Sequence, residues 1–298
     1  MFRHRGMRFA LALALLALIL RVIDRGMLLR HLSSLNPWAA TAMVGVNLLL
    51  LLLCSWRWLL IGSAAGFRAP WHSFIRSTWL SWAAAECGPA LIVGEWARFQ
   101  VMRNRAAPLQ LAMSQFVDRL SGYAGLILLA LVCIPWQVEF GEARRGVWTA
   151  LIVAVIGAGF FVMVLLLRRF RTTLGNEPGA LDSLAALFTV PWHYLLSLLI
   201  NVLFAVSFTL AALGLGFPVN GFSVFCLSPL VLLGVGSLPS LISDWGKREV
   251  VAVVVLSPLG FSPEQSLAVS IVYGGIHTVS ALPGLLLLLH RESGSGGR

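Results

Sequence analysis

Two short charged clusters interrupt apolar sequence in opposite halves of this chain. Each has a proline, a few apolar or small residues, and then an acid, a tryptophan and an arginine; the clusters span 87–98 and 237–249. Pro89 and Pro239 are 150 positions apart in a chain of 298 residues. Broken apolar segments at matching places in two halves are the sequence pattern of a transporter's substrate site. A charged side chain at mid-membrane costs roughly 2.5–3.5 kcal/mol. We therefore expect the charged residues beside these breaks to have a function.

The clusters and the stretch after the first one supply the predicted substrate-binding set: Glu86, Glu95, Arg98, Arg119, Lys247, Arg248 and Glu249. Arginine presents a planar fork that matches phosphate oxygens, and the backbone N–H groups at the start of a broken helix add an anion site. The acids can balance the arginines in the unloaded state, bind a cationic headgroup or carry a proton, and the sequence leaves these alternatives open. The competing interpretation of the arginines is that they reach out to lipid headgroups from helix ends.

The composition places the chain in a membrane. Hydrophobic residues make up 58% of the sequence and charged residues only 11%, against about 25% charged in a soluble domain. Lipid permits only helices or closed barrels, so we expect a single helical transmembrane domain over 1–290 with a flexible tail at 291–298. The net charge of +10 comes from arginines between the apolar runs, which favours contact with an anionic leaflet over nucleic acid.

The sequence offers no pattern for a metal, a cofactor or a known reaction. The four cysteines are scattered and have no CxxC spacing; they are Cys54, Cys87, Cys133 and Cys226. HExxH, P-loop and GxSxG motifs are absent, so the chain is predicted not to be an enzyme and to need no metal or cofactor. The lone His277 in the last apolar run is typical of hydrogen-bonded packing. The alternative function is a membrane-embedded glycosyltransferase, or an accessory subunit of a lipid-synthesis complex, although Asp24 is the one acid in the early outer loop.

Hydrophobic runs predict an all-α polytopic membrane protein of about eight helical segments. The strong candidates are 8–23, 38–61, 113–135, 147–167, 190–214 and 265–289. Two weaker segments contain Pro and Gly and end in charge, so each is either a broken span or a re-entrant hairpin; they are 72–97 and 222–245. Together the segments form two weakly repeated halves, about 38–145 and 190–290.

Basic residues predict the orientation. They cluster at 3–8, 57–76, 98–105 and 168–171. With the N-terminus in the cytoplasm, a re-entrant segment at 72–97 keeps all of these clusters on the cytoplasmic side of a plasma membrane, whereas a full crossing exports the last two. Arg21, Arg25 and Arg30 oppose this assignment. We therefore expect a re-entrant first segment and a multi-pass protein of the cytoplasmic membrane.

The clusters also resemble those of the flippase-like family of the lysylphosphatidylglycerol synthase transmembrane region. That family shows a proline, a "GGE..R" stretch and an acid-Arg-Leu with a following Gly in its first half, and a proline followed by "G.G.RE" in its second half. The corresponding residues here are Pro89, Gly94-Glu95-Trp96-Ala97-Arg98, Asp118-Arg119-Leu120-Ser121-Gly122, Pro239 and Trp245-Gly246-Lys247-Arg248-Glu249. The resemblance covers roughly 40–290. Val93 and Trp245 replace glycines that are usual in the family.

The resemblance implies a helical bundle with re-entrant pieces that moves a lipid or lipid-linked headgroup between leaflets. The best-known members carry aminoacylated phosphatidylglycerol made by a fused soluble synthase domain, which this sequence lacks. The implied substrate is then a phospholipid, a hopanoid-type lipid or a polyprenyl-phosphate-linked sugar, with lipid-synthesis enzymes as partners. A structural scaffold for such a complex is the remaining alternative.

Overall fold

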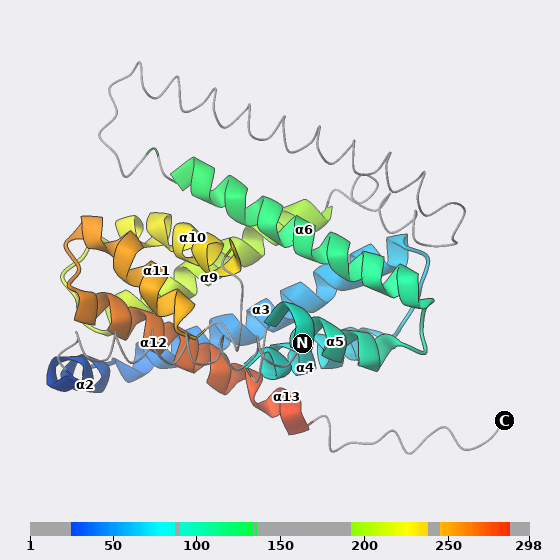
Figure 1. Ribbon diagram of the computed structural model, residues 1–298, viewed down its shortest axis with the longest axis horizontal. Helices are drawn as coiled ribbons and strands as arrows, with labels where there is room; N and C mark the ends of the chain where they lie inside the picture. The colour runs from blue at the N-terminus through cyan, green and yellow to red at the C-terminus, as the bar shows by residue number, and fades with distance from the viewer. Residues whose placement is uncertain (1–24, 87–89, 134, 136–191, 238–244, 287–298) are drawn as a thin grey trace, which may run out of the picture.

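The computed structural model describes residues 25–86, 90–133, 135, 192–237 and 245–286. In this part of the chain every regular element is a helix (Figure 1). The predicted spans 8–23 and 147–167 lie outside the described residues. An all-helical membrane protein, as the sequence predicts, is therefore what the described residues show.

Three described helices are long and apolar enough to cross a bilayer: α3 (Pro37–Ala64), α6 (Pro108–Cys133) and α9 (Trp192–Gly214). Each exceeds the about 20 residues that a hydrocarbon core requires. Pro37 occupies the first turn of α3, and the Asn36 side chain accepts a hydrogen bond from the Trp38 amide, so the local sequence fixes where this helix begins.

Helices α3 and α9 lie side by side and run in opposite directions. The Asn36 amide at the start of α3 donates to the Gly214 carbonyl at the end of α9 over 2.8 Å. Near the other end of the pair, Arg57 of α3 donates to Ser197, which lies early in α9. Four of the other described helices, α4, α6, α10 and α12, pack against this pair (Figure 1).

The first weak segment forms a hairpin of α4 (Trp71–Glu86) and α5 (Ala90–Met102). Their 16 and 13 residues reach only about 24 Å and 20 Å, which is short of the roughly 30 Å hydrocarbon core. One buried cluster joins the start of α4 to the end of α5, beside the end of α3 and the start of α6; it contains Trp58, Phe67, Phe74, Met102 and Leu111. The hairpin therefore returns to the end of the bundle from which it entered, as the re-entrant prediction requires.

Close packing inside this hairpin depends on Gly94. A Cβ atom at that position would lie 3.0 Å from the Ser81 Oγ and 3.1 Å from the Ser81 carbonyl oxygen on α4. These distances are tighter than ordinary van der Waals contact, so the glycine lets α4 and α5 pack closely.

The second weak segment enters from the opposite end of the bundle. Of the predicted 222–245, the structure describes α10 (Gly221–Ser237) and Trp245, while 238–244 lie outside the described residues; α11 (Lys247–Leu256) follows the predicted segment and packs against α10 to complete a hairpin. A 3-10 turn (Ser257–Leu259) then leads to α12 (Pro263–Ala281) and the short α13 (Pro283–Leu286). One large buried cluster ties this hairpin to the end of α9, and it includes Phe217, Val224, Leu256 and Phe261.

The two halves are structural repeats of inverted topology. The turns that follow α3 and α9 each contain a glycine with positive φ, Gly66 at 85° and Gly216 at 75°, and these glycines are 150 positions apart. Each half also packs against the other in a corresponding way. Helix α3 of the first half contacts α12 of the second, and α9 of the second half contacts α6 of the first. Because α3 and α9 are antiparallel, the two halves enter the bundle from opposite ends. The sequence predicts the repeat, and the packing shows that it is inverted.

Two predicted boundaries are wrong in a way that affects the site. The sequence starts the third strong helix at 113, whereas α6 begins at Pro108, so Asp118 and Arg119 lie well inside a helix and not at its opening. The second cluster does not close a broken helix, since Lys247, Arg248 and Glu249 form the first turn of α11. Among the described residues, hydropathy located the apolar runs that form α3, α6, α9 and α12. It missed polar residues that continue or begin a helix where other helices surround them.

Candidate functional site

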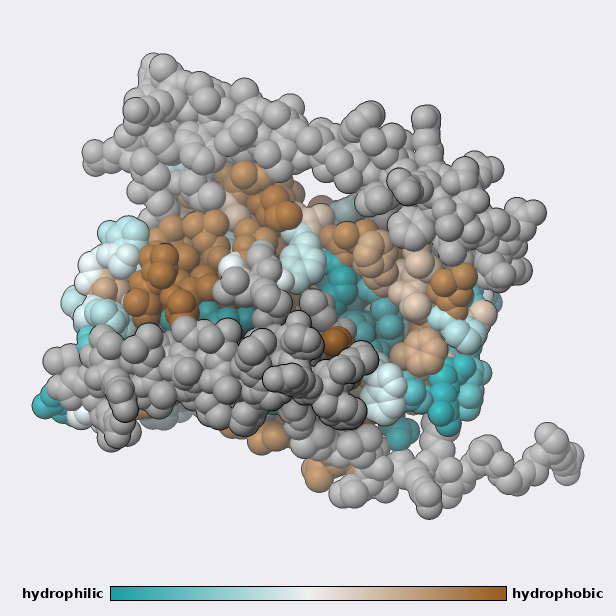
Figure 2. Space-filling model, viewed as in Figure 1, coloured by the Kyte–Doolittle hydropathy of each residue, from teal (hydrophilic) through white to brown (hydrophobic). Residues whose placement is uncertain are grey.

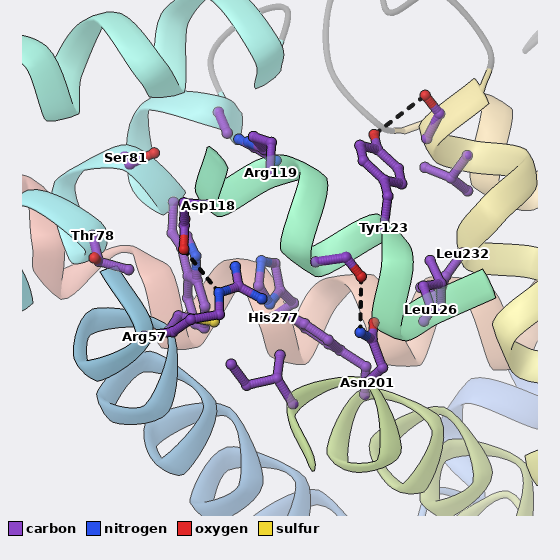
Figure 3. A pocket seen from close by; sticks show the side chains of 18 of the residues that line it. Arg57, Thr78, Ser81, Asp118, Arg119, Tyr123, Leu126, Asn201, Leu232 and His277 are labelled. Atoms are coloured by element: carbon purple, nitrogen blue, oxygen red, sulfur yellow. Dashed lines mark hydrogen bonds and ion pairs between the residues drawn. The ribbon is translucent and has the colours of Figure 1, made fainter. Parts of the chain in front are cut away.

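A cavity of about 300 Å³ lies between the two hairpins in the interior of the bundle. Its walls come from α3, α4, α5, α6, α9, α10, α11 and α12, so both repeats contribute (Figure 3). The volume is at the lower end of the range for small-molecule sites. On the face shown in Figure 2, hydrophilic residues lie near the middle, between two hydrophobic areas. A polar site inside an apolar bundle is the arrangement expected for a substrate site of a membrane protein.

Asp118 bridges two arginines on one side of the cavity. Arg57 Nε donates to Asp118 Oδ1 over 2.8 Å, and Arg98 Nη1 donates to Asp118 Oδ2 over 3.0 Å (Figure 3 draws the first bond). Arg57, Arg98 and Asp118 come from α3, α5 and α6, and all three residues are at most 6% exposed. Gly122 makes room for this arrangement, since a Cβ there would lie 3.3 Å from Arg57 Nη1.

Glu95 extends the same network towards a more open edge. Arg119 Nε donates to Glu95 Oε1 over 2.6 Å, and Arg98 Nη1 lies 3.5 Å from Glu95 Oε2. The Arg98 guanidinium also lies over the Trp58 ring, 4.0 Å from its centroid. The Arg119 side chain is 39% exposed, in contrast to the buried Arg57 and Arg98. Arg119 is therefore the arginine of this group that an incoming anion can reach most easily.

Arg248 faces the cavity from the second repeat, 150 positions after Arg98. Its Nη2 donates to Glu249 Oε1 over 3.1 Å and its Nε donates to Ser270 Oγ over 3.3 Å. The guanidinium lies 4.8 Å from the centroid of the Trp245 ring and 5.7 Å from that of Tyr273. Arg98 and Arg248 thus occupy corresponding places, each in contact with an aromatic ring and a carboxylate.

Glu249 holds the start of α11 in addition to holding Arg248. Its Oε2 accepts a hydrogen bond from the Gly246 amide over 2.5 Å, and Ser270 donates to its Oε1 over 3.1 Å. A glutamate at this position of a first helical turn satisfies an amide that the helix leaves unpaired. Glu249 is 3% exposed and does not line the cavity. Its position therefore indicates a supporting role for Arg248 and the helix start.

The tips of the two hairpins meet at Glu86. Trp245 Nε1 donates to Glu86 Oε2 over 3.0 Å, which joins the end of α4 to the residue before the α11 turn. Thr278 of α12 donates to the same oxygen over 2.9 Å. His277, next along α12, also lines the cavity, and its Nδ1 lies 3.0 Å from Asn47 Oδ1. A polar contact beside the cavity therefore joins the two repeats.

A second polar group braces α6 against α9 behind the cavity. The Asn201 side chain donates to the Gly122 carbonyl over 3.0 Å, as Figure 3 shows. Ser121 contacts both His193 Nδ1 and Ser197 Oγ, at 2.8 Å and 2.6 Å. Ser197 in turn accepts from Arg57 over 3.1 Å. These bonds fix the rotation of α6 and so hold Asp118 between its two arginines.

Four of the seven predicted residues line the cavity: Glu86, Arg98, Arg119 and Arg248. Glu95 and Glu249 lie behind the arginines that they contact, and Lys247 is not part of the lining. Arg98 and Arg248 are buried, at 5% and 6% exposure, so the interpretation that they reach out to lipid headgroups is wrong for both.

The predicted set omits several residues that the structure brings to the cavity. Arg57 and Asp118 complete the charged network, and Tyr123, Tyr273 and His277 line the wall. Arg57 stands next to Trp58 at the end of an apolar run, and Asp118 lies inside one, so unexplained charge in an apolar segment was the available signal. His277 carries a packing-type hydrogen bond, as expected, yet it also faces the cavity.

Among the described residues, no group of three or more His, Cys, Asp or Glu side chains is placed to hold a metal ion. Within the same residues, Cys54, Cys133 and Cys226 are free thiols, and Cys87 lies outside them. The cavity lining offers guanidinium, carboxylate, aromatic and hydroxyl groups.

The family described as the lysylphosphatidylglycerol synthase TM region matches residues 7–284. The chain belongs to this family. The match includes both hairpins, all the arginines of the cavity and nearly the whole of the sequence. No curated protein matches the chain significantly. Membership agrees with the three described spans, and the protein is a multi-pass membrane protein.

Proposed function

We propose that this protein moves a lipid with a phosphate-bearing headgroup between the two leaflets of the membrane, and that it is a transporter without enzymatic activity. The observation that carries the proposal is the cavity at the junction of two inverted hairpins, lined by Arg57, Arg98, Arg119 and Arg248. In transporters built from inverted repeats, the substrate site lies near the bilayer midplane at the repeat interface. The family places the protein in a lipid context.

The arginine network suits a phosphate for a physical reason. Asp118 and Glu95 already hold Arg57, Arg98 and Arg119 in fixed forks, so the donors are oriented before any substrate arrives. A phosphate binds such forks through paired N–H donors. The low dielectric of the membrane interior strengthens this attraction, and it also makes an unpaired charge costly. In this proposal the carboxylates occupy the arginines when the site is empty and share them with the phosphate when it is loaded.

Inverted repeats also supply a route between leaflets. The α4–α5 hairpin enters from one end of the bundle and the α10–α11 hairpin from the other, and they meet at the cavity. Rocking one repeat against the other around a fixed central site exposes that site to each side in turn. The Glu86–Trp245 contact is where the two repeats separate in this scheme.

Translocation by the purified protein in liposomes tests the proposal. The assay measures how fast a fluorescent phospholipid in the inner leaflet becomes accessible to an impermeant quencher added outside. A polyprenyl-phosphate-linked sugar is tested as a second substrate. We expect wild type to accelerate exchange of at least one of the two. Arg98→Lys, Arg119→Lys and Arg248→Lys should each impair it, because lysine keeps the charge but loses the fork.

Arg103→Lys is the matched control, because Arg103 is exposed, does not line the cavity and donates a hydrogen bond to Gln100. It should translocate lipid as wild type does. Unchanged translocation in a folded triple Arg→Lys variant would refute the phosphate-binding role of these arginines. Turnover of a sugar donor onto a lipid acceptor, with no translocation, would favour the membrane glycosyltransferase instead.

A further inference from the structure

The Glu86 carboxylate has a different environment from the other acids of the site. Its Oε2 oxygen accepts hydrogen bonds from Trp245 Nε1 and Thr278 Oγ1, which are both neutral donors from the second repeat. Within the described part of the chain, none of the basic side chains that form ion pairs does so with Glu86, and both of the hydrogen bonds to its carboxylate are at Oε2. One oxygen thus holds the two repeats together, and the residue itself lines the cavity.

The remaining acids are all engaged by arginines. Asp118 pairs with Arg57 and Arg98, Glu95 pairs with Arg119, and Glu249 pairs with Arg248. These ion pairs combine four guanidinium groups with three carboxylates. Glu86 is the fourth carboxylate of the group, so its protonation state decides the net charge. The site is neutral when Glu86 is ionised and carries one positive charge when Glu86 is protonated.

Other ionisable groups face Glu86 from every element that contributes charge to the cavity. They are Cys54 and Arg57 of α3, Arg98 of α5, Asp118, Arg119 and Tyr123 of α6, Arg248 of α11, and Tyr273 and His277 of α12. The lining residues of α9 and α10 are uncharged. His277 is the competing proton acceptor, because histidine titrates near neutral pH. Its Nδ1 lies 3.0 Å from the Asn47 Oδ1, an oxygen that accepts but cannot donate, which places a hydrogen on Nδ1.

We propose that Glu86 binds a proton together with the substrate's phosphate, and so couples lipid movement to the proton gradient. The proposal rests on the proposed function. The empty site with ionised Glu86 is neutral, and so is the site that holds both a proton and a phosphate monoanion. A site that holds only the proton has one net positive charge, and a site that holds only the phosphate has one net negative charge. Both states are penalised, because an unpaired charge is costly in a region of low dielectric. A proton taken from water onto Oε1 on one side is returned to water on the other side after the lipid departs.

The geometry allows Glu86 to change charge without breaking the contact between repeats. A protonated carboxyl group keeps a carbonyl oxygen that accepts two hydrogen bonds, so Trp245 and Thr278 can still donate to Oε2. Glu86→Gln reproduces this neutral form with the same shape and the same acceptor oxygen. The variant therefore separates the charge of Glu86 from its role in holding the hairpin tips.

Calorimetry of lipid binding tests the coupling. Wild type, Glu86→Gln and the control Glu264→Gln, which changes an acid at the start of α12 away from the cavity, are titrated with short-chain phosphatidylglycerol in detergent. Its phosphodiester keeps one negative charge between about pH 5 and about pH 8. Comparing two buffers of different ionisation heat gives the number of protons taken up per lipid.

We expect wild type and Glu264→Gln to take up protons on binding and to lose affinity as the pH rises, by roughly 5- to 150-fold, the usual range of coupling between two sites. Glu86→Gln should bind with no proton uptake and with an affinity that does not change over this range.

Wild-type binding without proton uptake would overturn the coupling while leaving the proposed function intact, and this measurement needs no variant. Equal proton uptake by Glu86→Gln and wild type would move the proton to another group, with His277 the first candidate. Failure of the wild-type protein to bind or translocate any phosphate-bearing lipid would remove the proposed function itself.

Discussion

Gly274 gives a sharp test of whether the position of Arg248 matters. A Cβ atom at residue 274 would lie 1.8 Å from Arg248 Nη2 and 2.3 Å from its Cζ, whereas ordinary contacts between such atoms are about 3.5–4.0 Å. The obstacle is the far end of a flexible side chain, so Gly274→Ala should leave α12 in place and move the guanidinium by about 2 Å. That shift breaks the bonds from Arg248 to Glu249 and Ser270, which are 3.1 Å and 3.3 Å long.

The neighbouring residue provides the control. A Cβ at Gly275 would meet nothing within 4 Å, so Gly275→Ala should stabilise the folded protein by about 0.5–1 kcal/mol through helix propensity alone. Gly274→Ala gains the same amount but loses a hydrogen-bonded charge contact worth about 1.5–3 kcal/mol, so its free energy of unfolding should fall by about 1–2 kcal/mol. The two adjacent variants should therefore differ measurably in stability.

The decisive readouts are unfolding in detergent and lipid translocation in liposomes. Gly274→Ala should stay folded and lose translocation, and each 1.4 kcal/mol of lost phosphate contact weakens lipid binding about tenfold. Gly275→Ala should translocate as wild type does. Equal stability and equal translocation in the two variants would refute the argument that a fixed Arg248 is needed.

Three further expectations follow from the packing. Asp118→Asn leaves Arg57 and Arg98 without their shared carboxylate, so the free energy of unfolding in detergent should fall by about 3–5 kcal/mol. A fall of less than about 1 kcal/mol would mean that the two ion pairs are not maintained. In an otherwise cysteine-free protein, Asn104→Cys should react with an impermeant thiol reagent from the cytoplasmic side and Asn220→Cys from the opposite side, because the two hairpins enter from opposite ends; labelling of both from one side would contradict the inverted topology. Glu95→Gln should keep expression and lose translocation, since Glu95 orients Arg119, and full transport would reduce Glu95 to charge balance.

The local signals of the sequence gave the helical membrane fold, the two broken segments and the repeat between them. These follow from hydropathy, from Pro and Gly positions and from the spacing of Pro89 and Pro239, all of which a chain carries without folding. The basic residues at 57–76 and 98–105 also predicted that these stretches share one end of the bundle. A re-entrant segment between them keeps both on the cytoplasmic side, whereas a full crossing would put them on opposite sides. The structure places the start of α4 and the end of α5 together, in agreement.

The composition of the site was decided by packing between helices. Asp118 lies 61 positions from Arg57 and 20 from Arg98, and no periodicity relates residues on three different helices. The sequence grouped Glu249 with the binding acids, but the fold uses it to cap α11 and to hold Arg248. Glu86 became central only because α4 ends beside the tip of the second hairpin, which brings it to Trp245, 159 positions away. Local patterns determine which segments enter the membrane, whereas the partner of each buried charge depends on how the helices pack and rotate, since an unpaired charge there is too costly to keep.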